Sequence, residues 1–221
     1  MLIHFVSSWP SFCVAFGGML FLILIMKWQS TRFYTQDVVL RKFSIMELEM
    51  PATQMELVNL IKGLYDLPPA TSAATVKALK GQLYTDFLFM PFAYGAILLL
   101  CMQLSNKISF SWGTNVFMVL AFLQLLAWLC DIVENIYLLN KIKPTVVAST
   151  LVVHKAYLSM ECLKWGIALI STISAVAAIC YFWLTGSYSF SSLYYLVIIL
   201  GEVAVFFIVS SVFFKKKDIA L

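Results

Sequence analysis

Long apolar stretches separated by shorter polar segments run through most of this chain. A membrane-spanning helix needs about 17 to 25 mostly apolar residues. Five stretches are long enough: residues 5–26, 87–104, 113–139, 157–184 and 190–214. The pattern therefore predicts an all-α fold, a polytopic transmembrane helix bundle of five spans.

Composition supports the same class. Hydrophobic residues make up 62% of the chain, charged residues 12%, and the mean hydropathy is +0.92. Soluble domains are about 45 to 50% apolar and about 25% charged. We therefore expect an integral membrane protein, with the lipid bilayer as one of its partners.

The polar residues divide the chain into three parts. We interpret residues 1–27 as an N-terminal signal-anchor span, because the apolar run has no basic segment before it and no small-residue cleavage site after it. Residues 28–85 form a cytoplasmic amphipathic helical segment that is too short to count on as a domain with its own core. Residues 86–221 then form a four-span bundle.

Helix signals are clear within the middle segment. Thr53 and Glu56 have the spacing of a capping box, and Gly63 is a stop signal for the helix that follows. The apolar face of this helix needs a partner, either the membrane surface or the cytoplasmic ends of the spans. Residues 72–82 favour a helix that runs directly into the second span.

The basic residues indicate the orientation. In a topology with the N-terminus outside, fourteen of the fifteen lysines and arginines lie on the cytoplasmic side. They are Lys27, Arg32, Arg41, Lys42, Lys62, Lys77, Lys80, Lys141, Lys143, Lys155, Lys164, Lys215, Lys216 and Lys217. We expect a bacterial inner membrane with the C-terminus in the cytoplasm. Because these residues are dispersed and lack a recognisable binding module, we expect no nucleic-acid partner.

The third apolar stretch carries ionisable groups at membrane depth. Asp131, Glu134 and Asn135 are spaced to share one helix face. A charged side chain inside the membrane costs at least ~2.5 kcal/mol on insertion scales and marks a functional site by default. The stretch therefore indicates where the protein acts.

Other polar residues lie toward the same leaflet. His154, Tyr157, Glu161 and Lys164 recur at helical spacing and form one stripe. If spans two, three and four converge, their polar residues line one ligand or ion pocket that opens to the cytoplasm. Its predicted members are Asp86, Tyr94, Asp131, Glu134, Asn135, Glu161 and Lys164.

Three interpretations of this cluster remain open. Lys164 can pair with Asp131 or Glu134 and hold the helices in register. Alternatively, the excess of carboxylates over lysine indicates protonated acids, a bound cation or contact with headgroup water. A third interpretation is acid/base chemistry on a lipid headgroup, although the chain has no HExxH, GxSxG or DxxD motif. We assign no catalytic residues and expect no cofactor. The sequence does not determine whether the cluster binds a metal ion.

The order of four short motifs resembles a set of uncharacterised bacterial multi-pass membrane proteins. The motifs are Leu48-Glu49, Asp86 with Tyr94 eight residues later, Asp131 to Asn135 in the pattern DxxEN, and Lys164-Trp165. The resemblance covers residues 45 to 180 and brings no established activity. It implies that Glu49 joins the intramembrane group by folding back over its cytoplasmic opening.

The function expected from these observations is non-enzymatic. We favour an accessory or partner-binding subunit of a membrane complex, with other membrane subunits or a second copy as partners. The alternative is an ion- or proton-coupled channel or transporter, which a central pore lined by Glu202 or Gln124 would favour. A lipid-headgroup-processing enzyme is the third possibility.

Overall fold

The computed structural model describes residues 8–37 and 39–214 of the chain. Its elements are α2 (Trp9–Ser30), β1 (Tyr34–Gln36), β2 (Leu40–Lys42), α3 (Ile45–Glu49), α4 (Gln54–Tyr65), α5 (Pro69–Lys107), α6 (Ser111–Lys141), α7 (Leu151–Leu184), the 3₁₀ helix η1 (Phe190–Ser192) and α8 (Leu193–Phe213). Among the described residues, five helices are long and apolar enough to cross a membrane: α2, α5, α6, α7 and α8. The all-α, five-span prediction is confirmed, and the protein is an integral membrane protein.

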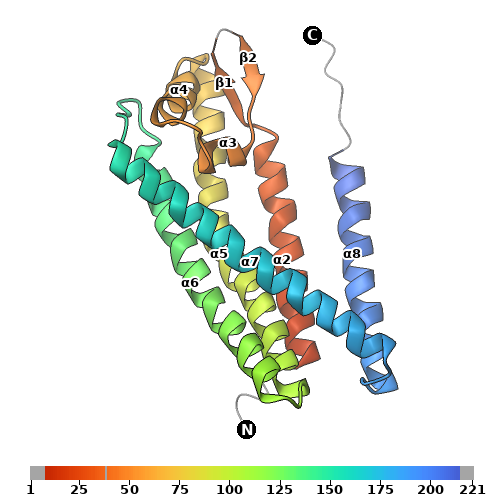
Figure 1. Ribbon diagram of the computed structural model, residues 1–221. Coiled ribbons are helices and arrows are strands. Elements are labelled where there is room, and N and C mark those ends of the chain that lie inside the picture. Colours follow the sequence, from red (N-terminus) through yellow and green to blue (C-terminus); the bar gives the residue numbers. More distant parts are fainter. Residues whose placement is uncertain (1–7, 38, 215–221) are drawn as a thin grey trace.

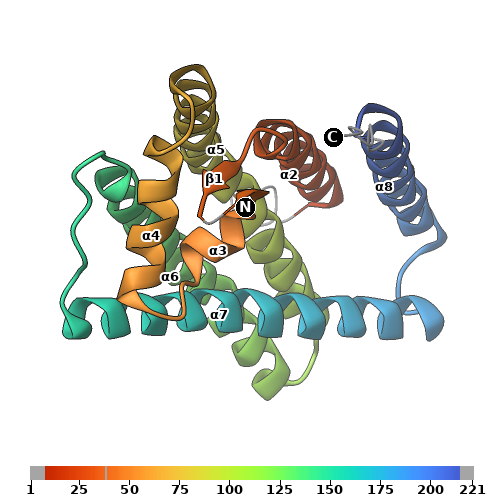
Figure 2. The same ribbon diagram turned by 90° about the horizontal axis from the view of Figure 1, so that it is seen from above.

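Helix α5 lies at the centre of the bundle and packs against α2, α6 and α7 (Figures 1 and 2). Helix α8 packs on α2 and stands apart from the rest. Two glycines of α2 permit these contacts. A side chain at Gly18 would come within 2.6 Å of the Phe92 ring on α5, and one at Gly17 would come within 2.9 Å of the Glu202 carboxylate on α8.

Helix α5 is much longer than its predicted span. It begins at Pro69 and continues through residues 72–82 into the apolar stretch without interruption. Proline is favoured at the first position of a helix because it has no N–H to leave unpaired there. The division predicted between residues 85 and 86 therefore falls inside one continuous helix.

Residues 31–37 and 39–66 form a compact unit at one end of the bundle, which we call the cap (Figure 1). It holds the β1–β2 hairpin, in which Tyr34 pairs with Lys42, and the helices α3 and α4. Its core contains the stacked rings of Phe33 and Phe43, and it is continuous with Leu83 of α5. The apolar face of the cap therefore packs on the ends of the spans.

The capping box predicted for α4 is formed only in part, because the Glu56 carboxylate accepts from the Ala52 N–H at 2.7 Å instead of from the Thr53 N–H. The Glu56 N–H donates to the Thr53 hydroxyl at 3.1 Å, and the helix ends at Tyr65, two residues beyond the predicted stop at Gly63. Gly63 has a different role, because a Cβ there would lie 2.2 Å from the Thr35 hydroxyl of β1. The missing side chain lets the hairpin pack directly on α4. The hairpin was not predicted, since its strands are only three residues long.

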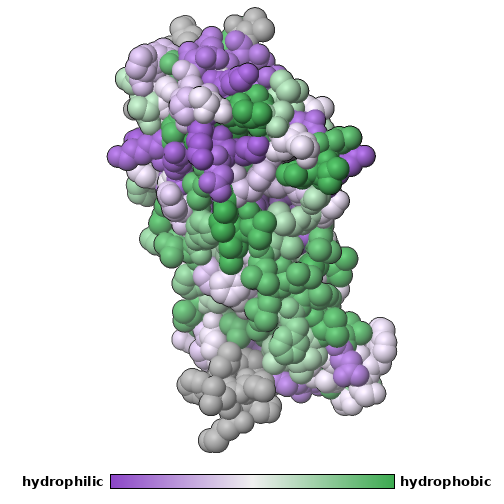
Figure 3. All heavy atoms as spheres, turned by 90° about the vertical axis from the view of Figure 1, so that its left-hand side faces the viewer, coloured by the Kyte–Doolittle hydropathy of each residue, from purple (hydrophilic) through white to green (hydrophobic). Residues whose placement is uncertain are grey.

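One face of the molecule is divided into three zones. On the side shown in Figure 3, an apolar band lies between the hydrophilic cap and a smaller hydrophilic rim at the opposite end of the bundle. Lys107 lies at the end of α5 far from the cap, whereas Lys27 of α2 and Lys141 of α6 lie at the helix ends nearest the cap. The predicted cytoplasmic lysines 215–217 and the first three residues of the predicted span 5–26 lie outside the described residues.

Candidate functional site

The buried Lys164 of α7 is surrounded by three carboxylates. Its ammonium group lies 3.0 Å from Asp131 Oδ1 and 2.9 Å from Glu161 Oε2, and it also pairs with Glu134. Asp131 and Glu134 lie one turn apart on α6, while Glu161 lies one turn before Lys164 on α7. We call these four residues the lysine cluster.

Two side-chain hydrogen bonds connect α5 to the same region. The Tyr94 hydroxyl donates to Asp131 Oδ2 at 2.9 Å, and the Asn135 amide donates to Asp86 Oδ2 at 2.7 Å. Asn135 also donates to the Leu83 carbonyl at 3.3 Å. Polar groups that bond across helices in this way fix the relative register of transmembrane helices.

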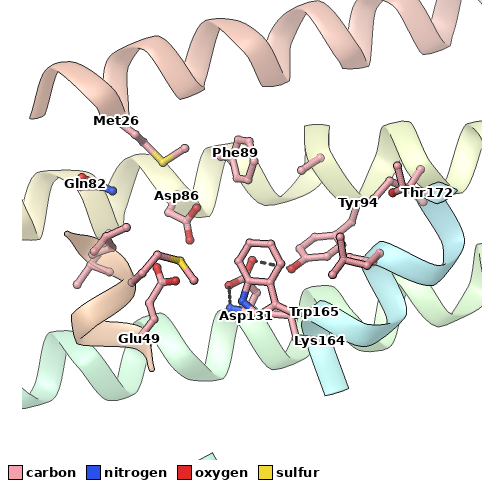
Figure 4. Close-up of a pocket in the computed structure, with 17 residues that line it drawn as sticks. Met26, Glu49, Gln82, Asp86, Phe89, Tyr94, Asp131, Lys164, Trp165 and Thr172 are labelled. Carbon is pink, nitrogen blue, oxygen red and sulfur yellow. Dashed lines mark hydrogen bonds and ion pairs between the residues drawn. The ribbon is translucent and has the colours of Figure 1, made fainter. Parts of the chain in front are cut away.

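A cavity of about 350 Å³ lies beside the lysine cluster, bounded by α2, α5, α7 and the cap helix α3 (Figure 4). Asp131 and Lys164 form part of its wall, together with the Trp165 ring. Most of the other lining groups are apolar. The cavity therefore combines a charged wall with an apolar interior.

Three hydrogen-bond acceptors lie where the cavity meets the cap. Glu49 of α3 points toward Asp86 of α5 across the space (Figure 4). No ion pair is found for either carboxylate among the described residues. Gln82, which is 7% exposed and also lines the cavity, has a buried side-chain oxygen with no hydrogen-bond partner within the described part of the chain. We call Glu49, Gln82 and Asp86 the acceptor end of the cavity.

Glu49 lies outside the membrane-spanning helices, and its electrostatics follow from its surroundings. Burial raises the pKa of Glu49, Lys164 opposes this, and the nearby carboxylates Asp86, Glu161 and Asp131 add to it, so that the pKa moves from 4.5 to about 7. Below about pH 7 the protonated form is therefore favoured in the folded protein. This contribution to stability is complete below pH 4.5 and is lost as the pH rises through 7.

The structure brings all eight predicted site residues together. Five line the cavity: Glu49, Asp86, Tyr94, Asp131 and Lys164. The other three, Glu134, Asn135 and Glu161, lie behind them and are bonded or paired to them. Among the described residues, no group of three or more His, Cys, Asp and Glu side chains is arranged to hold a metal ion.

Other polar residues singled out from the sequence lie elsewhere. His154 and Tyr157 are buried on α7 but do not line the cavity, and the Tyr157 ring packs 4.8 Å from Tyr137. Gln124 donates to the Ser171 hydroxyl at 2.8 Å inside the bundle. Glu202 faces Gly17 of α2, so it also lies outside the cavity.

Sequence reasoning missed several of the lining residues. Gln82 lies one helical turn before Asp86, so the same i, i+4 spacing that grouped the α6 residues would have found it. Met26 and Phe89 carry no such signal, because an apolar residue in a span has the same pattern whether it faces a cavity, a neighbouring helix or lipid.

Comparisons with known proteins supply no family for the chain. No family model, curated protein or solved structure matches it. The resemblance to bacterial multi-pass proteins therefore stays a prediction, and the function has to be argued from the site.

Proposed function

We propose that this integral membrane protein is a non-enzymatic binding subunit that holds a small, positively charged ligand in the cavity between α2, α5 and α7. The observation that carries the proposal is the acceptor end. There, Glu49, Gln82 and Asp86 present oxygen atoms without a cationic partner among the described residues.

The free energy of burial supports a cationic ligand. A carboxylate removed from water without a counter-ion is costly, so it either takes up a proton or binds a cation. Lys164 is already ion-paired with the three carboxylates of the lysine cluster. A cationic ligand would supply the missing positive charge, and the cavity volume of about 350 Å³ is within the usual range for small-molecule sites.

Packing in the other half of the bundle favours binding over conduction. Away from the cap, Phe12, Leu104, Ala175 and Ile179 belong to a buried apolar core between α2, α5 and α7. This packing supports a binding role over a pore that runs through the bundle.

We further propose that the chain belongs to the bacterial multi-pass proteins that its motifs resemble, and that the cap lies in the cytoplasm. The lysines near the cap and the single Lys107 at the opposite end support this orientation. A reporter inserted at residues 66–70 should be cytoplasmic, and one at Asn106 should be external. A cytoplasmic reporter at Asn106 would contradict the orientation.

Partner binding is the remaining part of the proposal. Helix α8 packs on α2 only through one face, and Val197, Val205 and Val212 are exposed on the rest of its surface. This surface is available to lipid, to another membrane subunit or to a second copy of the chain. Cross-linking from these positions in native membranes would identify the neighbour, and cross-links to lipid alone would contradict a subunit role.

The binding proposal is tested with the full chain in lipid nanodiscs. We expect butylammonium chloride to raise the thermal unfolding temperature, whereas sodium butyrate, of similar size and opposite charge, should have no effect. The double variant Glu49→Gln/Asp86→Asn should lose the response, and Glu202→Gln, which changes a carboxylate outside the cavity, should keep it. Equal responses to both salts would refute the proposal. Uptake of butylammonium into proteoliposomes would show that the protein is a transporter and not a binding subunit.

A further inference from the structure

The cavity is long and polar at one end only. Along α5 its lining extends from Gln82 to Ile97, which corresponds to about 22 Å of helix. The acceptor end lies next to the cap. Beyond the charged wall, the lining groups are apolar or weakly polar, and they end at Ile97 on α5 and Thr172 on α7.

The same cavity opens sideways. Helices α2 and α7 both pack on α5 (Figure 2). They contact each other at the end far from the cap, where the Trp9 and Trp183 rings stack at 5.5 Å, whereas nearer the cap Met26 of α2 and Trp165 of α7 both line the cavity. Trp165 and Leu169 of α7 line the cavity yet remain 39% and 53% exposed. In a membrane, this opening between α2 and α7 faces the hydrocarbon of the leaflet on the cap side.

The chemistry of the acceptor end selects the head group. Ionised Glu49 and Asp86 are acceptors only, and the unpartnered atom of Gln82 is its side-chain oxygen. A primary ammonium group has a positive charge and three N–H donors. A quaternary ammonium has no donor, and a phosphate would be repelled by the surrounding carboxylates.

We propose that the ligand is a single-chain amphiphile with a primary ammonium head, which enters from the bilayer between α2 and α7. Its head lies among Glu49, Gln82 and Asp86, and its alkyl chain lies along α5 and α7 toward Ile97 and Thr172. The inference rests on the proposed function, because it names the class of the cationic ligand in the same cavity.

The alkyl chain determines orientation more than affinity. Lipid tails are as apolar as the cavity wall, so a chain that moves from the bilayer into the cavity gains little from the hydrophobic effect. Hydrogen bonds and charge at the acceptor end then supply the binding free energy. The sharpest test therefore maps where each end of the ligand lies.

Two photoreactive dodecylamines provide that map, one with a diazirine beside the amine and one with a diazirine at the chain end. With the full chain in nanodiscs, only labelling that excess butylammonium removes is counted. We expect the first probe to label residues near Glu49 and the second to label residues near Ile97 and Thr172. The reverse pattern, or competed labelling at the same residues by both probes, would overturn the inference.

A pair of neighbouring variants separates this inference from the binding proposal. Thr172→Trp fills the apolar end of the cavity, whereas Ile173→Trp changes an exposed position on the lipid-facing side of the same helix. We expect Thr172→Trp to reduce the competed labelling by the chain-end probe at least tenfold, while butylammonium still raises the unfolding temperature. Ile173→Trp should change neither result.

The outcomes distinguish the two proposals. If butylammonium stabilises the protein but Thr172→Trp leaves chain-end labelling unchanged, the amphiphile inference is wrong and the binding proposal stands. If butylammonium has no effect on the wild-type protein, both are wrong.

Discussion

The lysine cluster and the acceptor end are neighbouring groups of acids that differ in one respect. In the lysine cluster, Asp131, Glu134 and Glu161 all pair with Lys164. At the acceptor end, Glu49 and Asp86 have no cation among the described residues and face open space. A paired buried carboxylate has a structural explanation, whereas an unpaired one beside a cavity needs a ligand or a proton. Pairing therefore separates the part that holds the bundle together from the part that binds.

The largest effect is expected from removing the lysine. Lys164→Met leaves three buried carboxylates without their counter-ion and should reduce the free energy of unfolding by ~3 to 5 kcal/mol. Denaturant unfolding in detergent measures this change. Lys62→Met, at an exposed position, is the matched control. Adding Glu134→Gln to Lys164→Met should recover part of the loss, and equal stability of the wild type and Lys164→Met would mean that the lysine has no structural role.

Neutralising one carboxylate in each region should change ligand affinity in one region only. Asp86→Asn removes a charge from the acceptor end and should weaken butylammonium binding at least tenfold, about 1.4 kcal/mol, without loss of stability. Glu134→Gln removes a charge from the lysine cluster and should leave that affinity within about threefold, because it does not line the cavity. Isothermal titration in nanodiscs measures both, and equal losses of affinity would remove the distinction.

A loss of stability smaller than that of Lys164→Met is expected where the two regions meet. Tyr94 lines the cavity and donates to Asp131 of the lysine cluster. Tyr94→Phe removes a hydrogen bond to a charged acceptor and should destabilise the protein by ~1.5 to 3 kcal/mol, with butylammonium affinity nearly unchanged. Tyr84→Phe, on the exposed face of α5, is the control and should have no measurable effect. A large loss of affinity in Tyr94→Phe would assign Tyr94 to the binding part.

The smallest effect is expected from pH. The pKa of Glu49 is about 7 mainly because of burial, and the facing groups are Asp86 on α5, Asp131 and Glu134 on α6, and Tyr157, Glu161 and Lys164 on α7. Ionised Glu49 attracts a cation, so butylammonium affinity should rise between pH 6 and 8, by at most about tenfold per pH unit for one linked proton. Stability without ligand should fall over the same interval. Glu49→Gln should flatten both curves, and unchanged curves would assign the titration to another group.

Much of the bundle could be predicted from the sequence because its signals are strong. An apolar run of membrane length has few alternatives to a spanning helix. A carboxylate within such a run costs so much free energy that it must find a partner or a polar space. The amino-acid sequence alone is therefore enough to predict that Asp131 and Glu134 lie near Lys164.

The cap and the cavity shape were harder to predict for a physical reason. Three-residue strands carry too little alternation to identify a hairpin, and the role of Gly63 depends on how closely β1 approaches α4. Glu49 was placed only through a resemblance, since nothing in its local sequence shows that α3 folds back over the bundle. Which apolar side chains leave a space between helices depends on tertiary packing, so the lateral opening was not foreseen.

Helix α3 spans only five residues, yet it belongs to both halves of the molecule. Leu48 is fully buried in the core of the cap, and its neighbour Glu49 lines the cavity. An ion pair of 2.7 Å between Arg41 and Glu47 holds the same helix to the hairpin. The packing of Leu48 in the core of the cap therefore fixes where the Glu49 carboxylate lies along the cavity wall.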